Sequence, residues 1–167
     1  MKWRVPEWLQ LGPWKCISSM NTPQTTMEIL QYTQALCESL EVDYRLYCTR
    51  SHRHCVERNQ DAHYHNKCLQ EIANGTYTFT TTFEIVEGRK YYKVVMLTSG
   101  NRSVHCFVNK TTGDVLKSAS WNAPAKGVRY NLLNKESREN CYRYADWSGR
   151  YLYLRWVHLS FQFTLLD

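Results

Sequence analysis

The sequence predicts a single α+β domain in which an N-terminal helical region packs on a four-stranded antiparallel meander sheet, with a short helical C-terminal segment. Three observations lead to this prediction. Apolar residues recur every three or four positions from about residue 27 to 73, which is the helical period. The period changes to two between residues 77 and 119, as in half-buried strands. Short turn sequences separate the alternating runs, and such turns join neighbouring antiparallel strands.

The length of 167 residues is enough for one domain with its own hydrophobic core. We expect that domain to cover residues 27–155. Residues 1–26 are expected to form a leader, because prolines and a glycine interrupt any long helix there. Residues 156–167 are expected to form an apolar C-terminal tail that packs on another surface.

The helical region is expected to start near Pro23, because proline suits the first position of a helix. Its apolar stripe is longer than one ordinary helix, so we expect a break between Thr49 and Asp61, where charged residues and histidines become dense. Asn74 and Gly75 close the region, with Gly75 suited to the left-handed residue that ends a helix.

Four strands are expected, at about residues 77–85, 91–97, 103–108 and 115–119. The sequence NKTTGD between the last two predicts a hairpin turn with Gly113 in the left-handed conformation. Four short strands joined in this way form a meander.

Beyond the fourth strand, we expect Pro124 to start a helical piece that leaves the sheet, and a second helix at about residues 135–144. Further on, Tyr151 and Tyr153 alternate with their neighbours as they would in a strand.

Three stretches resemble a group of small uncharacterised proteins encoded by bacteriophages and related environmental viruses. They read GRKYYKVV from residue 88, RSVHCFVNKTTGDVLKSASWNAPAKGVRYNL from residue 102, and ADWSGRYLYLR from residue 145. The pattern KTTGDV…ASWxAPAK…RxNL carries most of the likeness. The resemblance implies a viral origin and a compact α+β domain, and it implies no activity.

The formal net charge of +6 is unevenly distributed along the chain. Residues 1–86 carry eight basic and nine acidic side chains, whereas residues 87–167 carry thirteen basic and six acidic ones. A basic excess of this kind favours an acidic partner, such as nucleic acid or an acidic protein surface. A solvated basic face that aids solubility would produce the same count.

Cysteine usage and hydropathy bear on the compartment. Seven cysteines are an odd number, which argues against a complete disulfide framework. The N-terminus has no continuous apolar segment of the secretory type, and no run approaches the roughly 20 apolar residues that span a bilayer. We therefore expect the host cytoplasm as the location, free thiols, and no membrane partner.

The candidate binding surface combines cations with aromatic rings in and around the predicted sheet. Single-strand-binding proteins stack bases on such rings and hold phosphates with such cations. Lysine and arginine also cover apolar sheet edges without any binding role. Lys93 and Tyr91 share a face by alternation and belong to this constellation. The residues on which we place the binding surface are Lys117, Trp121, Lys126, Arg129, Arg102 and Tyr130.

A second group consists of cysteines and histidines in the helical region. Two helices in a hairpin could bring four of them around a zinc ion. The spacings match no zinc-finger pattern, so the more ordinary interpretation is core cysteines beside histidines on a polar face. The zinc candidates are Cys48, His52, Cys55, His65 and Cys68. We otherwise expect no resident cofactor.

Catalysis has little support in the sequence. His105 and Cys106 are neighbours in a predicted strand, so alternation places their side chains on opposite faces, where they cannot form a catalytic pair. No two carboxylates after residue 86 have a spacing that suggests a general acid and base.

These observations favour a non-enzymatic phage accessory protein that acts by binding a host or viral macromolecule. One alternative is a nucleic-acid-binding protein that uses a basic and aromatic sheet surface. Another is a small zinc- or cysteine-dependent enzyme. Whether the partner is a protein or a nucleic acid stays open at this point, as does the oligomeric state.

Overall fold

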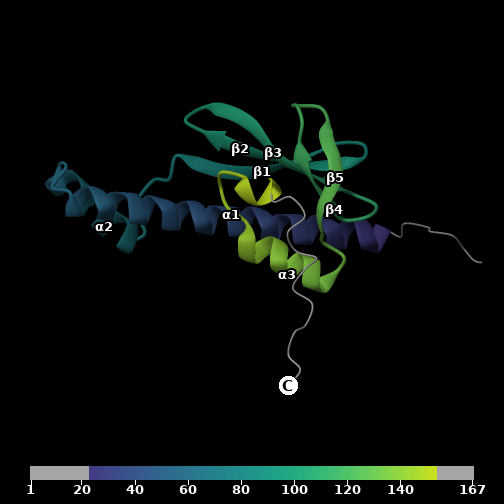
Figure 1. The fold of residues 1–167 in the computed structure, drawn as a ribbon, viewed down its shortest axis with the longest axis horizontal. Helices are drawn as coiled ribbons and strands as arrows, with labels where there is room; N and C mark the ends of the chain where they lie inside the picture. The colour runs from purple at the N-terminus through teal and green to yellow at the C-terminus, as the bar shows by residue number, and fades with distance from the viewer. Residues whose placement is uncertain (1–22, 154–167) are drawn as a thin grey trace, which may run out of the picture.

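The computed structural model describes residues 23–153 and confirms an α+β fold with an antiparallel sheet (Figure 1). Most of the expected leader 1–26 and all of the expected tail 156–167 lie outside the described residues. In chain order the elements are α1 (Pro23–Glu57), α2 (Ala62–Ala73), β1 (Thr81–Glu87), β2 (Tyr91–Thr98), β3 (Asn101–Asn109), β4 (Asp114–Ser118), β5 (Pro124–Asn131), α3 (Lys135–Tyr144) and the 3-10 helix η2 (Arg150–Tyr153).

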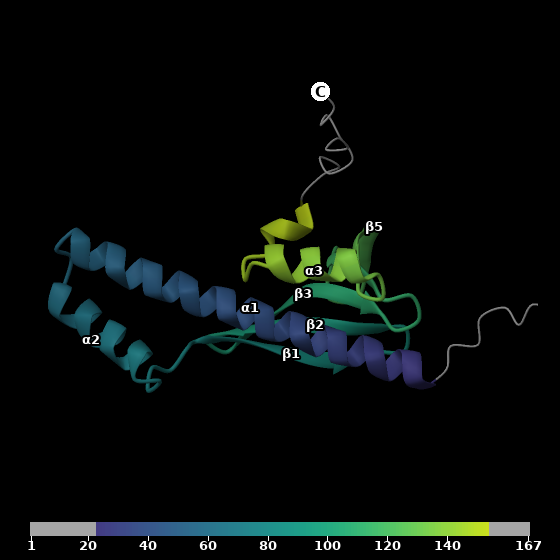
Figure 2. The ribbon, with the colours of Figure 1, turned by 90° about the horizontal axis from the view of Figure 1, so that it is seen from below.

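Helix α1 runs the length of the molecule, because one apolar stripe continues along it. Ile29, Leu36 and Leu40 on that stripe are fully buried against the sheet and α3. The 35 residues give a helix about 52 Å long. The far half of α1 extends beyond the sheet, and α2 folds back along it (Figures 1 and 2).

The break between α1 and α2 lies within the predicted interval. Asn59 and Asp61 adopt positive φ values of 55° and 44° there, which reverses the chain. The predicted end of the helical region is also confirmed. Gly75 follows the C-cap residue Asn74 with φ 73°, and its N–H donates to the carbonyl of Ile72.

The sheet has five strands in the order β1-β2-β3-β4-β5, all antiparallel, so the prediction of four strands is wrong. Pro124 starts β5 and pairs with Ser118 of β4 instead of starting a helix. An edge strand tolerates proline, because one of its sides needs no backbone donors. The predicted hairpin turn between β3 and β4 is confirmed, with Gly113 at φ 72°.

Two other element boundaries differ from the prediction. Strand β1 begins at Thr81 instead of residue 77, because the rings of Tyr77 and Phe79 pack on His52 and Tyr44 of α1 instead of entering the sheet. Residues 150–153 form η2 rather than a strand, whereas the helix predicted at 135–144 matches α3.

Helices α1 and α3 lie on the same side of the sheet (Figures 1 and 2). We call this side the helix face and the opposite side the open face. The helix face contributes its alternate side chains to the core together with α1, α3 and η2. These core side chains are Tyr92, Val94, Cys106, Val108 and Val115.

A β-bulge in β3 changes the face that one side chain reaches. Val94 pairs with Cys106, but its neighbour Val95 pairs with Val104, so His105 is left unpaired between them. The ring of His105 stacks on Tyr151 of η2, and Cys106 is also in the core beside Tyr151. The prediction that His105 and Cys106 lie on opposite faces is therefore wrong, because alternation fails at the bulge.

A second bulge in β5 has a similar effect. Val115 pairs with Tyr130 and Leu116 pairs with Val128, so Arg129 is unpaired. Its Nε donates to the carbonyl oxygen of Leu152 at 2.7 Å. Both bulges thus turn a polar side chain toward η2.

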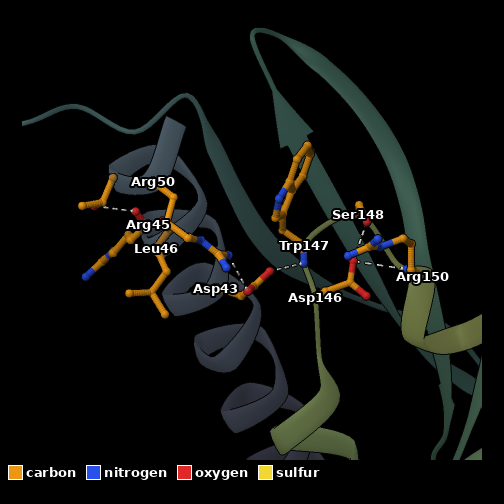
Figure 3. A network of polar contacts seen from close by, with 9 residues as sticks. Asp43, Arg45, Leu46, Arg50, Asp146, Trp147, Ser148 and Arg150 are labelled. Atoms are coloured by element: carbon orange, nitrogen blue, oxygen red, sulfur yellow. Dashed lines mark hydrogen bonds and ion pairs between the residues drawn. The ribbon is translucent and has the colours of Figure 1, made fainter. Parts of the chain in front are cut away.

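Polar contacts fix the loop that leads into η2 (Figure 3). The carboxylate of Asp146 accepts hydrogen bonds from the Ser148 hydroxyl and from the N–H groups of Arg150 and Tyr151, which caps η2. Burial opposes the charge of Asp146, but these hydrogen bonds outweigh burial and lower the pKa. The N–H of the next residue, Trp147, donates to Asp43 of α1 at 3.0 Å and ties the loop to that helix.

Candidate functional site

Trp121 is the centre of a cluster on the open face. It lies in the loop between β4 and β5, and 43% of its surface is exposed. The ammonium nitrogen of Lys93 lies 4.9 Å from the centroid of its ring, and the guanidinium carbon of Arg102 lies 5.8 Å from it. These cations come from β2 and β3, so three separate segments meet at one indole.

The cluster continues along β2 to a second aromatic ring. Lys93 also lies over the ring of Phe107, at 5.8 Å, and Phe107 packs edge-on against Tyr91. Phe107 is buried and forms the floor, whereas Tyr91 is half-buried and carries Lys90 over its ring at 5.3 Å. We call Lys90, Tyr91, Lys93, Arg102 and Trp121 the open-face cluster.

Backbone hydrogen bonds hold the loop that carries Trp121. The N–H groups of Ala119 and Ser120 both donate to the carbonyl of Ala123, at 3.0 and 3.1 Å. Arg102 of the cluster forms an ion pair with Glu84 of β1. This ion pair orients the guanidinium and adds a carboxylate to the edge of the cluster. The Trp121 loop and the Arg102 guanidinium are therefore held by contacts within the fold.

The structure divides the predicted binding surface between two faces of the sheet. Lys117 pairs with Cys106 in the register, and its ammonium nitrogen lies 3.8 Å from the ring centroid of Tyr153 in η2. Arg129 binds the Leu152 carbonyl, and the ring of Tyr130 stacks on Tyr151. Lys117, Arg129 and Tyr130 thus belong to the helix face, Lys126 is exposed on β5, and Trp121 and Arg102 belong to the open face.

Alternation in the sequence could have predicted part of this division. Lys117 lies two positions after the core residue Val115, so a strand places both on one face. Lys93 shares its face with Tyr91 by the same rule, although our predicted site did not include it. The position of Arg129 depends on a bulge, for which the sequence carries no such signal.

The zinc candidates gather where α2 folds back on α1. Nδ1 of His52 lies 2.8 Å from Nδ1 of His65, and Nε2 of His52 lies 3.2 Å from the Tyr77 hydroxyl. Burial, and then the neighbouring imidazole of His65, lower the pKa of His52, which favours the neutral ring. A single proton shared between the two Nδ1 atoms accounts for their short distance.

The cysteines of this region are less available than the histidines. Cys48 and Cys68 are buried and Cys55 is half-buried, and all three are free thiols. Within residues 23–153, no three His, Cys, Asp or Glu side chains form a group that could hold a metal ion.

A buried polar cluster surrounds the bulge in β3. Nε2 of His105 lies 3.2 Å from the Tyr151 hydroxyl. Burial lowers the pKa of His105 to about 4 and raises that of Cys106. At neutral pH the cluster therefore holds an uncharged imidazole beside an uncharged thiol, and an uncharged thiol is a poor nucleophile.

A pocket of about 200 Å³ lies between α1 and the start of β1. Its side chains are engaged in the fold, since Arg45 stacks on Phe79 and Glu41 accepts the N–H of Phe83. The Tyr44 hydroxyl is also hydrogen-bonded, to Thr80. The pocket offers no convergent group for chemistry.

No helix among the described residues has the length and apolar character needed to cross a membrane.

Comparison with known proteins places the chain in a family. No curated protein and no solved structure matches the sequence. A family model described as a family of unknown function (DUF7717) matches residues 16–154, which include every described element. The chain therefore belongs to this family of unknown function, DUF7717.

Proposed function

We propose that this protein is a non-enzymatic accessory protein of a bacteriophage that binds a macromolecule of the host cell or the virus through the open-face cluster. The observation that carries the proposal is the half-exposed ring of Trp121 under two cations from different strands. Tryptophan, tyrosine and arginine are the residues on which binding energy concentrates in protein interfaces, and aromatic rings with cations also bind nucleic acids.

The rest of the proposal has separate support. A role without catalysis agrees with the burial of Cys106 and His105, whose pKa shifts keep both uncharged at neutral pH. A viral origin, and with it action in the host cytoplasm, rests on the resemblance of the sequence around residues 102–132 to phage proteins.

Photo-crosslinking tests the proposal directly. Replacing Trp121 with a photoreactive phenylalanine derivative should produce covalent adducts in a bacterial lysate, and nuclease or protease treatment of an adduct identifies its class. The matched control carries the same group at Tyr153, an exposed aromatic residue on the helix face. Adducts of equal yield at both positions, or none at position 121, would contradict the proposal.

A further inference from the structure

We infer that the open-face cluster binds single-stranded nucleic acid, with bases stacked on Trp121 and Tyr91 and phosphates held by Lys93, Arg102 and Lys90. The inference rests on the proposed binding role of this face and names the chemical class of its partner.

The cluster contains the same unit twice. Trp121 lies under Lys93 and Arg102, and Tyr91 lies under Lys90, at cation-to-centroid distances of 4.9, 5.8 and 5.3 Å. Each unit pairs an aromatic ring with a cation. A nucleic acid strand repeats a base and a phosphate, so two such units on one face suit two positions of the strand.

Both units have a ring surface that a base can reach. Trp121 is 43% exposed and Tyr91 is half-buried, whereas Phe107, which packs edge-on against Tyr91, is buried. The cations that cover these rings are on long, flexible side chains. An arriving base takes the place of the cation on the ring, and the displaced ammonium or guanidinium remains beside the phosphate.

The local charge favours a polyanion. Three cations belong to the cluster, and among residues 23–153 the carboxylate of Glu84 forms an ion pair with one of them, Arg102. The surrounding half of the chain, residues 87–167, also carries a basic excess. An acidic protein segment would satisfy the cations but would leave the aromatic rings without flat partners, so the observations favour nucleic acid.

Single strands fit the cluster better than duplexes. The bases of a duplex are stacked on one another and turn only their edges outward, so they cannot lie on Trp121 or Tyr91. In a single strand the bases can be splayed apart and stacked on protein rings. The sheet therefore favours single strands.

Fluorescence anisotropy with a labelled 20-nucleotide oligo-dT and oligo-U, the matching duplex, and a polyglutamate peptide tests the inference. The full-length protein should bind both single strands at low salt and the duplex more weakly. Trp121→Ala should weaken single-strand binding about tenfold or more. Trp121→Phe keeps an aromatic ring and should retain most of the wild-type affinity. Lys93→Gln combined with Arg102→Gln should lower the salt slope of log K by about 1.4, since each lost phosphate contact removes about 0.7.

The control variant combines Lys117→Gln with Tyr153→Ala. It removes a lysine and an exposed aromatic ring of the same kind from the helix face. Single-strand affinity should change less than twofold in this variant. Circular dichroism and thermal unfolding of every variant identify any that fails to fold. If Trp121→Ala fails to fold, the salt slope of the variant that combines Lys93→Gln with Arg102→Gln carries the test.

Three results would overturn the inference, and they separate it from the proposed function. Equal affinity for duplex and single strand, with no effect of Trp121→Ala, would mean that phosphate contacts account for the binding and that no base stacks on Trp121. Binding of polyglutamate but not of oligonucleotides, with crosslinks to protein at position 121, would keep the proposed function and replace nucleic acid with an acidic protein. No binding of any probe, with no crosslinks at position 121, would remove both.

Discussion

The sheet presents a lysine beside an exposed aromatic ring on each of its faces. On the helix face Lys117 lies 3.8 Å from the ring centroid of Tyr153, and on the open face Lys93 lies 4.9 Å from that of Trp121. The first pair belongs to a region where η2 is capped by Asp146 and Arg129 binds a backbone carbonyl of η2. The second pair joins a loop to a strand and lies over a floor of buried Phe107.

We propose that the same pair of residue types has two uses in one sheet. On the helix face Lys117 lies over the ring of Tyr153 and Arg129 donates to the Leu152 carbonyl. Loss of these cations should therefore reduce stability. On the open face the cations also cover the exposed ring of Trp121 and the half-buried ring of Tyr91, so their loss should reduce binding more than stability. Four predictions test this contrast, in order of decreasing effect.

The largest effect is expected where α1 packs on the helix face. Leu36→Ala removes a fully buried side chain and should lower the free energy of unfolding by about 2–5 kcal/mol. Leu46→Ala in the same helix is the matched control, because Leu46 is 56% exposed, and it should change stability by less than about 0.5 kcal/mol. Urea unfolding measures both values. A similar loss in both variants would contradict the burial of this face.

The second effect is a dependence of stability on pH. His105 has a folded pKa of about 4, below the usual 6.5, because burial disfavours the charged ring. Its contribution to stability is therefore complete above pH 6.5 and is lost as the pH falls toward 4. Between pH 7.5 and 4.5 the loss should be about 2–3 kcal/mol. The lowered pKa of His52 acts in the same direction.

His105→Gln separates the buried histidine from the others. Urea unfolding at pH 7.5 and 4.5 should show a much smaller pH dependence in this variant than in the wild type. Equal pH dependence in both proteins would mean that the imidazole on the helix face is not held uncharged.

The third effect concerns the cap of η2. Asp146→Ala removes the acceptor for the N–H groups of Arg150 and Tyr151 and should cost about 0.5–2 kcal/mol in thermal unfolding. Asp146→Asn keeps an oxygen acceptor and should lose less. An alanine variant as stable as the wild type would show that the cap does not hold η2 on the helix face.

The smallest effect on stability is expected on the open face. Lys93→Gln removes a cation from the rings of Trp121 and Phe107 and should lower the free energy of unfolding by less than about 1 kcal/mol. Chemical unfolding beside the Asp146→Ala variant gives the comparison. A loss above 2 kcal/mol would assign Lys93 to the fold and remove the contrast between the faces.

Much of the fold could be predicted from hydrophobic periodicity and turn chemistry. The helical stripe, the break between Thr49 and Asp61, the Gly113 hairpin and α3 all depend on local patterns, and the structure confirms them. Strand β5 was missed because Pro124 suits both a helix start and an edge strand, and only the neighbouring β4 decides between them. The prediction starts strand β1 too early, because Tyr77 and Phe79 follow the alternation of a strand but pack on α1.

The candidate site could be predicted only in part, for a different reason. Trp121 and Arg102 were expected to share a surface, and they do. The bulges at His105 and Arg129 insert one residue into a regular alternation, and nothing in the local sequence marks the position. Much of the motif that suggested a family also has a structural role: Asn131 bridges Asp114 and the Thr112 carbonyl, each at 2.8 Å.

We propose that ligand meets the open face at Trp121 and leaves the helix face unchanged. An NMR titration of the ¹⁵N-labelled protein with unlabelled oligo-dT tests it most directly, with indole signals assigned through Trp→Phe variants. The indole N–H of Trp121 should shift with the β2 and β3 amides near Lys93 and Arg102, while that of Trp147, which packs on Tyr44 and Tyr47, stays in place. Shifts centred on η2 and Trp147, with Trp121 unmoved, would contradict the claim.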